Sequence, residues 1–402
     1  MSTTTVPDIR THFAEIIADI AATAVQRETD RGLPYEAVRR LRDAGFGAVR
    51  VPREYGGWGV SLEELFRLLI ELGAADSNLP QLLRGHIAFV ETQRALPDSP
   101  QRRDWFASIV SNEIRFGNAQ AELGESSTNA TTITERDGRL FVTGRKFYST
   151  GTLYADWIWS GGVWDGQAVA FAVNATAPGV TRIDDWDGFG QKLTGSGTTI
   201  YEDVEIDPAH VLPWTDADGH RSLAYTQGMY QLILLSALAG IARRTLTDAV
   251  EFVRPRTRTF GIPGQTSPRD EPLVQRVVGK LGGIAFSTEA TALEAVRRLE
   301  RADLTRAEAA DEDEHYYTAL VAVFEAQHAI IEQVLHGTGL LFEVGGASAV
   351  SQQKQLDRLW RNARTIASHN PAAYREQSVG AFHLNGTLPK SQLHLARNEK
   401  TG

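Results

Sequence analysis

The sequence has no cysteine among its 402 residues. This absence excludes disulfides, thiolate nucleophiles, cysteine-ligated zinc or iron–sulfur sites and cysteinyl attachment of a flavin. Long apolar runs are lacking too, because the most apolar stretch, 232–242, ends at Arg243 and is too short to span a bilayer. The first ten residues show no secretory signal. We therefore expect a cytoplasmic protein without a membrane partner.

Several catalytic motifs are also missing. No GxGxxG segment leads from a strand into a helix, no Walker phosphate loop occurs, and Gly195-Ser196-Gly197 does not complete a nucleophile elbow. The ten histidines never fall at HxxxH or HExxH spacing, so we expect no zinc site. Positive charges form no basic stripe, so nucleic acid is not an expected partner. These absences argue against hydrolases and against oxidoreductases that bind NAD(P)H themselves.

The hydrophobic period changes twice along the chain. Apolar residues have helical spacing over 8–30 and 34–45, and a capping-box pattern begins at Ser61. Short β-prone runs alternate with turn signals from 116 to 206. Long helical patterns then return over 222–253, 272–301, 313–334 and 352–368. The order predicts an α+β chain with a helical domain, a compact antiparallel sheet or barrel, and a helical bundle, at 1–115, 116–221 and 222–402.

Five motifs occur in the order found in the acyl-CoA dehydrogenase superfamily, which the chain resembles over nearly its whole length. They are VPREYGGWG at 51–59, GRKFYSTG at 144–151, FGIP at 260–263, FEVGG at 342–346 and RNAR at 361–364. The resemblance implies an N-terminal helical domain, a central antiparallel β-barrel and a C-terminal four-helix bundle. It also implies that Arg256 or Arg258 meets the cofactor phosphates of a neighbouring subunit. The implied flavin contacts are Asn118, Tyr148, Ser149, Thr150, Trp186, Arg256, Arg258, Phe260, Gly345, Gly346 and Asn370.

The segment after RNAR departs from the dehydrogenases. One large branch has a glutamate there that removes the α-proton of a thioester, whereas this chain has His369-Asn370-Pro371. This tripeptide and LNGTLP at 384–389 resemble the dibenzothiophene monooxygenase group, which takes reduced FMN from a separate NAD(P)H:flavin reductase. The resemblance implies oxygenation of a small apolar or aromatic S-, N- or C-centre with O2, through a flavin C4a-(hydro)peroxide. It further implies a homotetramer, with FAD as an alternative cofactor.

Three residues are predicted to carry the chemistry: His369, His86 and Thr150. An imidazole, with an ordinary pKa of about 6.5, can donate and recover a proton near neutral pH, whereas a carboxylate would repel a peroxide anion. By the resemblance, Thr150 bonds flavin N5, His86 lies on the substrate side, and Tyr148 and Trp186 form aromatic walls. The structural alternatives are His369 as a helix-end cap, His86 as an ordinary buried histidine, Thr150 as a strand residue, Asn118 as a turn residue, Trp186 as core, and the arginines as a solvated loop.

Two other functions compete with the monooxygenase. A true dehydrogenase would need a relocated base, for which Glu251, Glu325 and Glu343 are candidates on the C-terminal elements. A non-catalytic relative would keep the fold without turnover. Bleaching of the flavin by an acyl-CoA distinguishes the first alternative, and failure to retain any flavin distinguishes the second.

Overall fold

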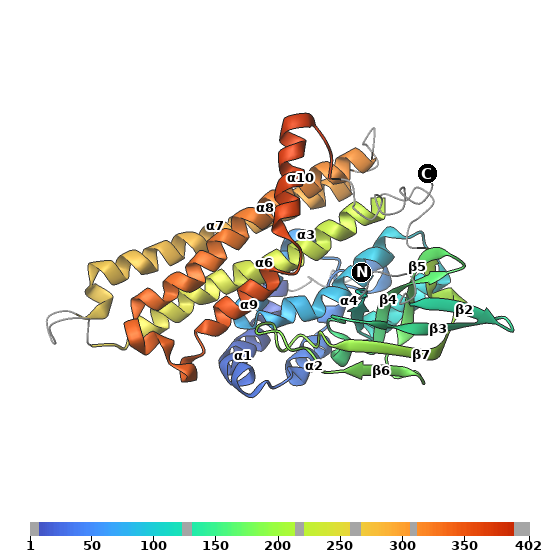
Figure 1. Ribbon diagram of the computed structural model, residues 1–402, viewed down its shortest axis with the longest axis horizontal. Helices are drawn as coiled ribbons and strands as arrows, with labels where there is room; N and C mark the ends of the chain where they lie inside the picture. The colour runs from blue at the N-terminus through green and yellow to red at the C-terminus, as the bar shows by residue number, and fades with distance from the viewer. Residues whose placement is uncertain (1–7, 123–130, 214–220, 258–266, 306–311, 390–402) are drawn as a thin grey trace, which may run out of the picture.

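The computed structural model follows the predicted helical–β–helical order (Figure 1). It describes residues 8–122, 131–213, 221–257, 267–305 and 312–389. The N-terminal part contains α1 (Ile9–Asp30), α2 (Tyr35–Asp43), α3 (Leu62–Ala75), α4 (Asn78–Ala95) and α5 (Pro100–Val110). The predicted capping box is confirmed, because Ser61 Oγ accepts from the Glu64 backbone N–H and the Glu64 carboxylate accepts from the Ser61 backbone N–H. Among the described helices, none has the length and apolar character that a membrane crossing needs.

The middle of the chain forms a mixed sheet in the order β6-β7-β3-β2-β4-β5-β8, with β1 paired to β4. Its strands are β1 (Phe116–Ala119), β2 (Thr132–Arg136), β3 (Arg139–Lys146), β4 (Trp157–Trp164), β5 (Gln167–Asn174), β6 (Val180–Ile183), β7 (Thr198–Ile206) and β8 (Val211–Pro213). Most pairs are antiparallel, but β4 pairs in parallel with β1 and β2. The α+β class is confirmed. The predicted closed barrel is wrong for the described residues, because β6 and β8 end the sheet unpaired with each other. Strand-like spacing predicts strands but not closure.

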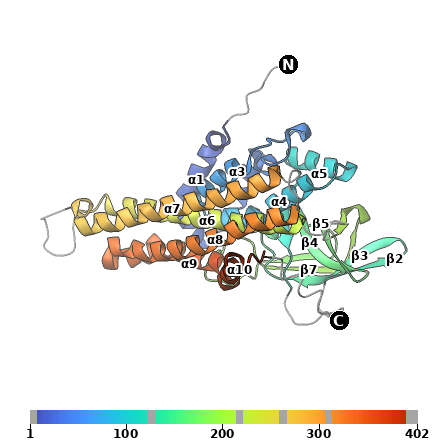
Figure 2. The ribbon, with the colours of Figure 1, turned by 90° about the horizontal axis from the view of Figure 1, so that it is seen from above.

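The last part of the chain is a bundle of long helices. It contains α6 (Arg221–Val253), α7 (Pro272–Leu304), α8 (Glu312–Leu340), α9 (Asp357–Ala367) and α10 (Ala372–Asn385). Figures 1 and 2 show α6, α7 and α8 side by side, extending away from the sheet. The four predicted helices are confirmed, whereas α10 was not predicted. Helix α10 has no buried residue, so its sequence lacks the apolar stripe by which a helix is recognised.

The N-terminal helices and the bundle share one hydrophobic core. Residues of α3 and α4, such as Leu69 and Leu79, belong to the same buried cluster as Leu232 and Leu235 of α6. Burial of this continuous apolar surface is the main force that fixes α4 against α6. The side chains of α4, α6 and the turn after α9 can therefore meet in one place.

Candidate active site

Helix α4 carries a cation on its buried face. Arg84 is 5% exposed, and its Nη2 donates a 2.9 Å hydrogen bond to Nε2 of His369. The guanidinium carbon lies 5.0 Å from the ring centre of Tyr230, on α6. Its Nε is buried without a hydrogen-bond partner. Desolvation lowers the pKa of Arg84 to about 10, and no carboxylate of the described chain opposes that shift. Arg84 is thus a buried cation without a described counter-ion.

His369 follows α9 and is a neutral imidazole. A guanidinium can only donate, so Nε2 of His369 accepts and the ring proton lies on Nδ1, which donates to Asn370 Oδ1 over 3.3 Å. Burial, and then the Arg84 charge, lower the pKa of His369 to about 3. Solvent nevertheless reaches more than a third of the residue. A ring that protein surrounds but solvent reaches is accessible to a small molecule, which argues against a simple helix-end cap.

Asn370 fixes the turn that carries His369. Its Nδ2 donates to Gln231 Oε1 of α6 over 2.7 Å, and its backbone carbonyl accepts from Gln327 Nε2 of α8 at 3.1 Å. Both glutamines are buried. The turn is therefore held against two bundle helices, which keeps His369 directed toward α4.

A second set of hydrogen bonds connects the Arg84 side of the site to the sheet. The Tyr230 hydroxyl donates to Asn118 Oδ1, on β1, over 3.4 Å. The Asn118 backbone N–H donates to the Thr150 carbonyl over 3.0 Å. Burial raises the pKa of Tyr230 to about 12, so its hydroxyl keeps its proton. Through Arg84 and Tyr230 these contacts connect three of the residues named from the sequence, His369, Asn118 and Thr150.

The strand motif offers features that fit a flavin. Ser149 is fully buried, and its Oγ has no hydrogen-bond partner, whereas Thr150 Oγ1 bonds Ser196 Oγ at 2.8 Å. Tyr148 has φ of 55°, which is uncommon for a bulky residue and often marks a functional site. Tyr148 is 53% exposed, and its ring centre lies 5.9 Å from that of Trp186, with the two rings nearly perpendicular. An unpartnered buried hydroxyl beside an accessible aromatic pair suits a planar cofactor with polar edges.

His86 lies away from this site. Residues two apart on a helix point about 200° from each other, so His86 faces the side of α4 opposite to Arg84. Its Nε2 donates to the Gly47 carbonyl at 2.9 Å, and its Nδ1 accepts from the Phe116 backbone N–H at 3.3 Å. With both nitrogens engaged by the backbone, this geometry favours the alternative of an ordinary buried histidine.

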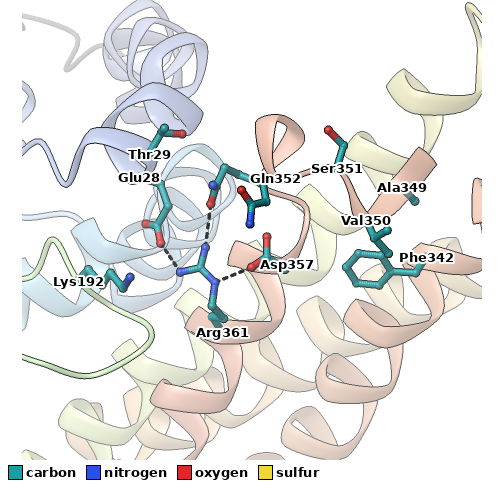
Figure 3. Close-up of a pocket in the computed structure, with 11 residues that line it drawn as sticks. Glu28, Thr29, Lys192, Phe342, Ala349, Val350, Ser351, Gln352, Asp357 and Arg361 are labelled. Carbon is teal, nitrogen blue, oxygen red and sulfur yellow. Dashed lines mark hydrogen bonds and ion pairs between the residues drawn. The ribbon is translucent and has the colours of Figure 1, made fainter. Parts of the chain in front are cut away.

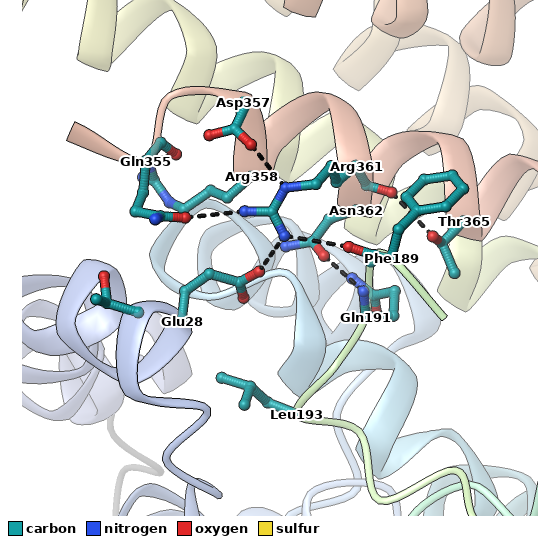
Figure 4. A network of polar contacts seen from close by, with 12 residues as sticks. Glu28, Phe189, Gln191, Leu193, Gln355, Asp357, Arg358, Arg361, Asn362 and Thr365 are labelled. Carbon is teal, nitrogen blue, oxygen red and sulfur yellow. Dashed lines mark hydrogen bonds and ion pairs between the residues drawn. The ribbon is translucent and has the colours of Figure 1, made fainter. Parts of the chain in front are cut away.

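Helix α9, which ends just before His369, is anchored by a polar network (Figure 4). Arg361 Nη1 donates to Glu28 Oε1 of α1 at 2.9 Å, and Asn362 Oδ1 accepts from the Gln191 backbone N–H at 2.6 Å. Desolvation raises the pKa of Glu28, and the Arg361 charge opposes that shift. The network ties α9 to α1 and to the loop between β6 and β7, so it orients the turn that follows α9.

Arg256, Gly345 and Gly346 form a separate group beyond the C-terminal ends of α6 and α8. Arg256 Nη2 donates to Ser348 Oγ at 2.8 Å, and its guanidinium lies 4.7 Å from the ring centre of Phe252. A Cβ on Gly345 would lie 2.2 Å from that ring, so only glycine fits. Gly346 has φ of 52°, a left-handed conformation that favours glycine.

An open cavity of about 550 Å³ lies near this group (Figure 3). It adjoins the N-terminal end of α9, whereas His369 follows the C-terminal end. The 11 residues of α9 span roughly 16 Å, so the cavity and His369 are separate sites. Arg258 and Phe260 lie outside the described residues. The cavity is lined by side chains that include Glu28, Lys192, Phe342, Val350 and Arg361.

Two family models match the chain: the acyl-CoA dehydrogenase N-terminal domain at 6–113 and the C-terminal domain at 232–373. The chain belongs to the acyl-CoA dehydrogenase family. It is 29% identical over 380 residues to dibenzothiophene monooxygenase of Mycolicibacterium goodii, with 91% of each chain covered. FMN-bound TdsC of Paenibacillus sp. A11-2 has a TM-score of 0.87 at 26% identity, covering 94% of this chain and 98% of that chain. The methanesulfinate monooxygenase MsuC of Pseudomonas fluorescens has a TM-score of 0.87 at 25% identity, covering 96% of this chain and 98% of that chain.

These matches confirm the predicted place of the chain among the flavin-dependent monooxygenases of the family. The carboxylates proposed for a dehydrogenase lie elsewhere. Glu251 and Glu325 pair at 3.3 and 2.8 Å with an arginine and a histidine, and Glu343 is exposed. In the described structure none of the three bonds to His369 or Arg84. The candidate site therefore contains a neutral imidazole, and none of the three carboxylates reaches it.

Arg84 and Tyr230 are not among the residues predicted from the sequence. Arg84 lies in an apolar segment, 79–90, between Leu83 and Ile87. A lone cation at a helical position that should face the core is a readable signal, because charged residues are rarely buried without a partner. Tyr230 has no such signal, since tyrosine is common in helix cores.

Proposed function

We propose that this chain is the oxygenase of a two-component system, with a separate NAD(P)H:flavin reductase that supplies reduced FMN. The enzyme uses the reduced flavin and O2 to oxygenate a small apolar or aromatic S-, N- or C-centre. The observation that carries the proposal is His369: a neutral, accessible imidazole where a large branch of dehydrogenases has its base. FMN fits the sequence motif, the unpartnered Ser149 hydroxyl and the FMN-bound relative.

Each residue of the proposed site has a definite task. Bound FMN would supply the reaction with O2. The free Ser149 hydroxyl offers a hydrogen bond to its polar edge, Thr150 would add one by exchanging its bond to Ser196, and Tyr148 and Trp186 offer aromatic contact. Asn118 and Asn370 orient the strand and the turn on either side. Nδ1 of His369 carries the proton and makes only the long 3.3 Å bond to Asn370, so this N–H would be given to a reacting oxygen when that bond opens, while Nε2 stays bonded to Arg84.

The assembly and the location are part of the proposal. Arg256, Gly345 and Gly346 would meet the flavin phosphate of a neighbouring subunit, which explains why they lie beyond the C-terminal ends of α6 and α8, away from Gln231 and the turn that carries His369. Helix α10 exposes Tyr374 and Leu384, apolar surface that a homotetramer would cover. The cytoplasm is the proposed location because NAD(P)H for the reductase is available there.

The relatives leave the substrate open. Dibenzothiophene is apolar and aromatic, methanesulfinate is a small anion, and TdsC binds indole together with FMN. The first test is therefore a panel of thioethers, amines, indoles and phenols, added to the anaerobically reduced protein–FMN complex before ¹⁸O2. We expect one ¹⁸O atom in the product of at least one compound. Flavin reoxidation without any labelled product, together with flavin bleaching by an acyl-CoA, would instead establish a dehydrogenase.

A further inference from the structure

Arg84 places a condition on what binds beside His369. We infer that the substrate carries a carboxylate or a similar oxyanion, which pairs with Arg84 and presents the apolar body of the substrate to the reacting flavin. That the bound anion is the substrate of the flavin reaction rests on the proposed function. The anion site itself rests on Arg84 alone, so the two ideas can fail separately.

Other buried arginines of the described chain have carboxylate partners. Arg50 bonds Glu91 at 2.6 Å, and Arg358 bonds Asp248 at 2.9 Å, with all four side chains buried. Arg84 instead bonds a neutral imidazole and lies over an aromatic ring. Burying a charge without a counter-ion costs several kcal/mol. This cost is offset if the ligand that binds beside His369 supplies the negative charge that Arg84 lacks.

The face of α4 that carries Arg84 also has unused hydrogen-bonding atoms. The Nε of Arg84 is buried without a partner, and so is Oε1 of Gln81, one helical turn earlier on the same face. Gln81 is 6% exposed, so water does not readily replace the missing partner. A planar carboxylate accepts two parallel N–H bonds from a guanidinium, which is the contact that Arg84 still lacks. The Tyr230 ring, 5.0 Å away, holds the guanidinium plane in place.

The FMN phosphate is the other source of an oxyanion. The geometry favours the substrate, because Arg84 bonds His369, the residue proposed to act at the reacting atoms. A phosphate lies at the far end of the flavin side chain from the reacting ring. Arg256, the phosphate candidate from the sequence, follows the C-terminal end of α6, roughly 30 Å along the helix from Gln231, which holds the turn of His369. The experiment below separates the two sources.

The test is calorimetric titration of the full-length, FMN-loaded protein without reductant or turnover. The probes are acetate, benzoate and 2-naphthoate, each beside its neutral amide. The variants are Arg84→Met, Arg84→Lys and the control Arg94→Met, which removes an arginine of the same helix that pairs with Glu91 at 2.6 Å. Flavin fluorescence gives the FMN affinity of every variant, and circular dichroism reports folding.

We expect wild type to bind at least one carboxylate more tightly than its amide. Arg84→Met should weaken that carboxylate by roughly tenfold or more while the amide changes little. Arg84→Lys keeps the charge but cannot form two parallel N–H bonds, so its carboxylate affinity should lie between those of wild type and Arg84→Met. Arg94→Met should match wild type. A wild type without any preference for carboxylates overturns the inference, even if no variant folds. Loss of FMN affinity in Arg84→Met with unchanged carboxylate affinity also overturns it and assigns Arg84 to the phosphate. Carboxylate binding without any oxygenation would overturn only the proposed function.

Discussion

Helix α4 takes part in two buried arginine contacts. In one the arginine has a carboxylate partner, and in the other it has a neutral imidazole. Glu91 lies seven residues after Arg84 and so on nearly the same helix face. It accepts from Arg50 Nε at 2.6 Å and from the Tyr225 hydroxyl at 2.7 Å. Against desolvation, Glu91 raises the pKa of Arg50. At the other contact Arg84 meets only the neutral His369, and desolvation lowers its pKa to about 10.

The difference separates a structural cation from a functional one. Arg50 and Glu91 satisfy each other and join the N-terminal segment to α4 and, through Tyr225, to α6. Such a complete network rigidifies a core and offers nothing to a ligand. Arg84 has an unused donor and no described counter-ion. The number of open hydrogen-bonding positions, and not burial as such, is what distinguishes the two arginines.

The largest expected effect concerns stability. Arg50→Met leaves the buried Glu91 carboxylate without its main partner and should lower the free energy of unfolding by about 3–5 kcal/mol. Arg84→Met removes a buried charge that has no described counter-ion, so it should change that free energy by less than about 1 kcal/mol or raise it. Urea denaturation of both variants checks the comparison. Equal destabilisation by both would mean that Arg84 is as structural as Arg50.

The same network predicts how the stability of the fold changes at acid pH. Although desolvation opposes it, Arg50 and Arg94 lower the pKa of Glu91 to about 2, below its ordinary value of 4.5. A depressed carboxyl pKa stabilises the fold fully above the ordinary pKa, and that contribution is lost as the pH falls toward the folded-state value. The stability difference between wild type and Arg50→Met should therefore shrink between pH 4.5 and 2. A constant difference over that range would contradict the ion pair.

The next effect concerns catalysis. The variant His369→Ala removes the hydrogen-bond partner of Arg84. His369→Ala should lower product formation about a hundredfold, the lower range for loss of a general acid–base group. FMN affinity should stay near that of wild type, and more of the O2 consumed should appear as H2O2. The control is His328→Ala, a half-exposed histidine that pairs with Glu376 at 3.1 Å on the bundle surface. Full product yield in His369→Ala would remove His369 from the mechanism.

The sequence alone predicts one half of this site and misses the other half. His369, Asn370 and Thr150 lie in local motifs, so their resemblance to known segments can be read along the chain. Arg84 acquires its meaning only from three separate segments that converge on it: α4, α6 and the turn after α9. No spacing in the sequence records which side chains meet across 285 residues.

The fold shows the same limit. Helical and strand-like periods predict the long helices and the α+β order, because those patterns express which face is buried. Whether the sheet is open depends on whether its end strands β6 and β8 pair with each other, which is a long-range choice. His86 and Arg84 show the same dependence on long-range packing within one helix. Two residues apart, they face opposite sides, and only the packing of α4 on β1 decides which one reaches the site.

A smaller effect concerns that packing. A Cβ on Gly85 would lie 2.8 Å from Asn118 Cβ and 2.9 Å from Asn118 N. Gly85→Ala should therefore lower the free energy of unfolding by about 1–3 kcal/mol, the usual cost of overpacking. It should also weaken carboxylate binding, because α4 must shift at Arg84. The control Gly279→Ala lies in α7 with nothing within 4 Å and should stabilise by about 0.5–1 kcal/mol. A Gly85→Ala variant with wild-type stability and binding would show that α4 tolerates movement here.

The smallest effect is a flat pH profile. The groups that meet at Arg84 are His369, with its pKa lowered to about 3, and Tyr230, with its pKa raised to about 12. The guanidinium itself loses its proton only near its pKa of about 10. A bound carboxylate should therefore keep its affinity within about twofold from pH 6 to 9, a range in which none of the three groups changes its protonation. Calorimetry of benzoate or whichever carboxylate binds best checks this. A transition near pH 6.5 would mean that His369 is protonated in the bound state, so that the imidazole and not Arg84 holds the anion.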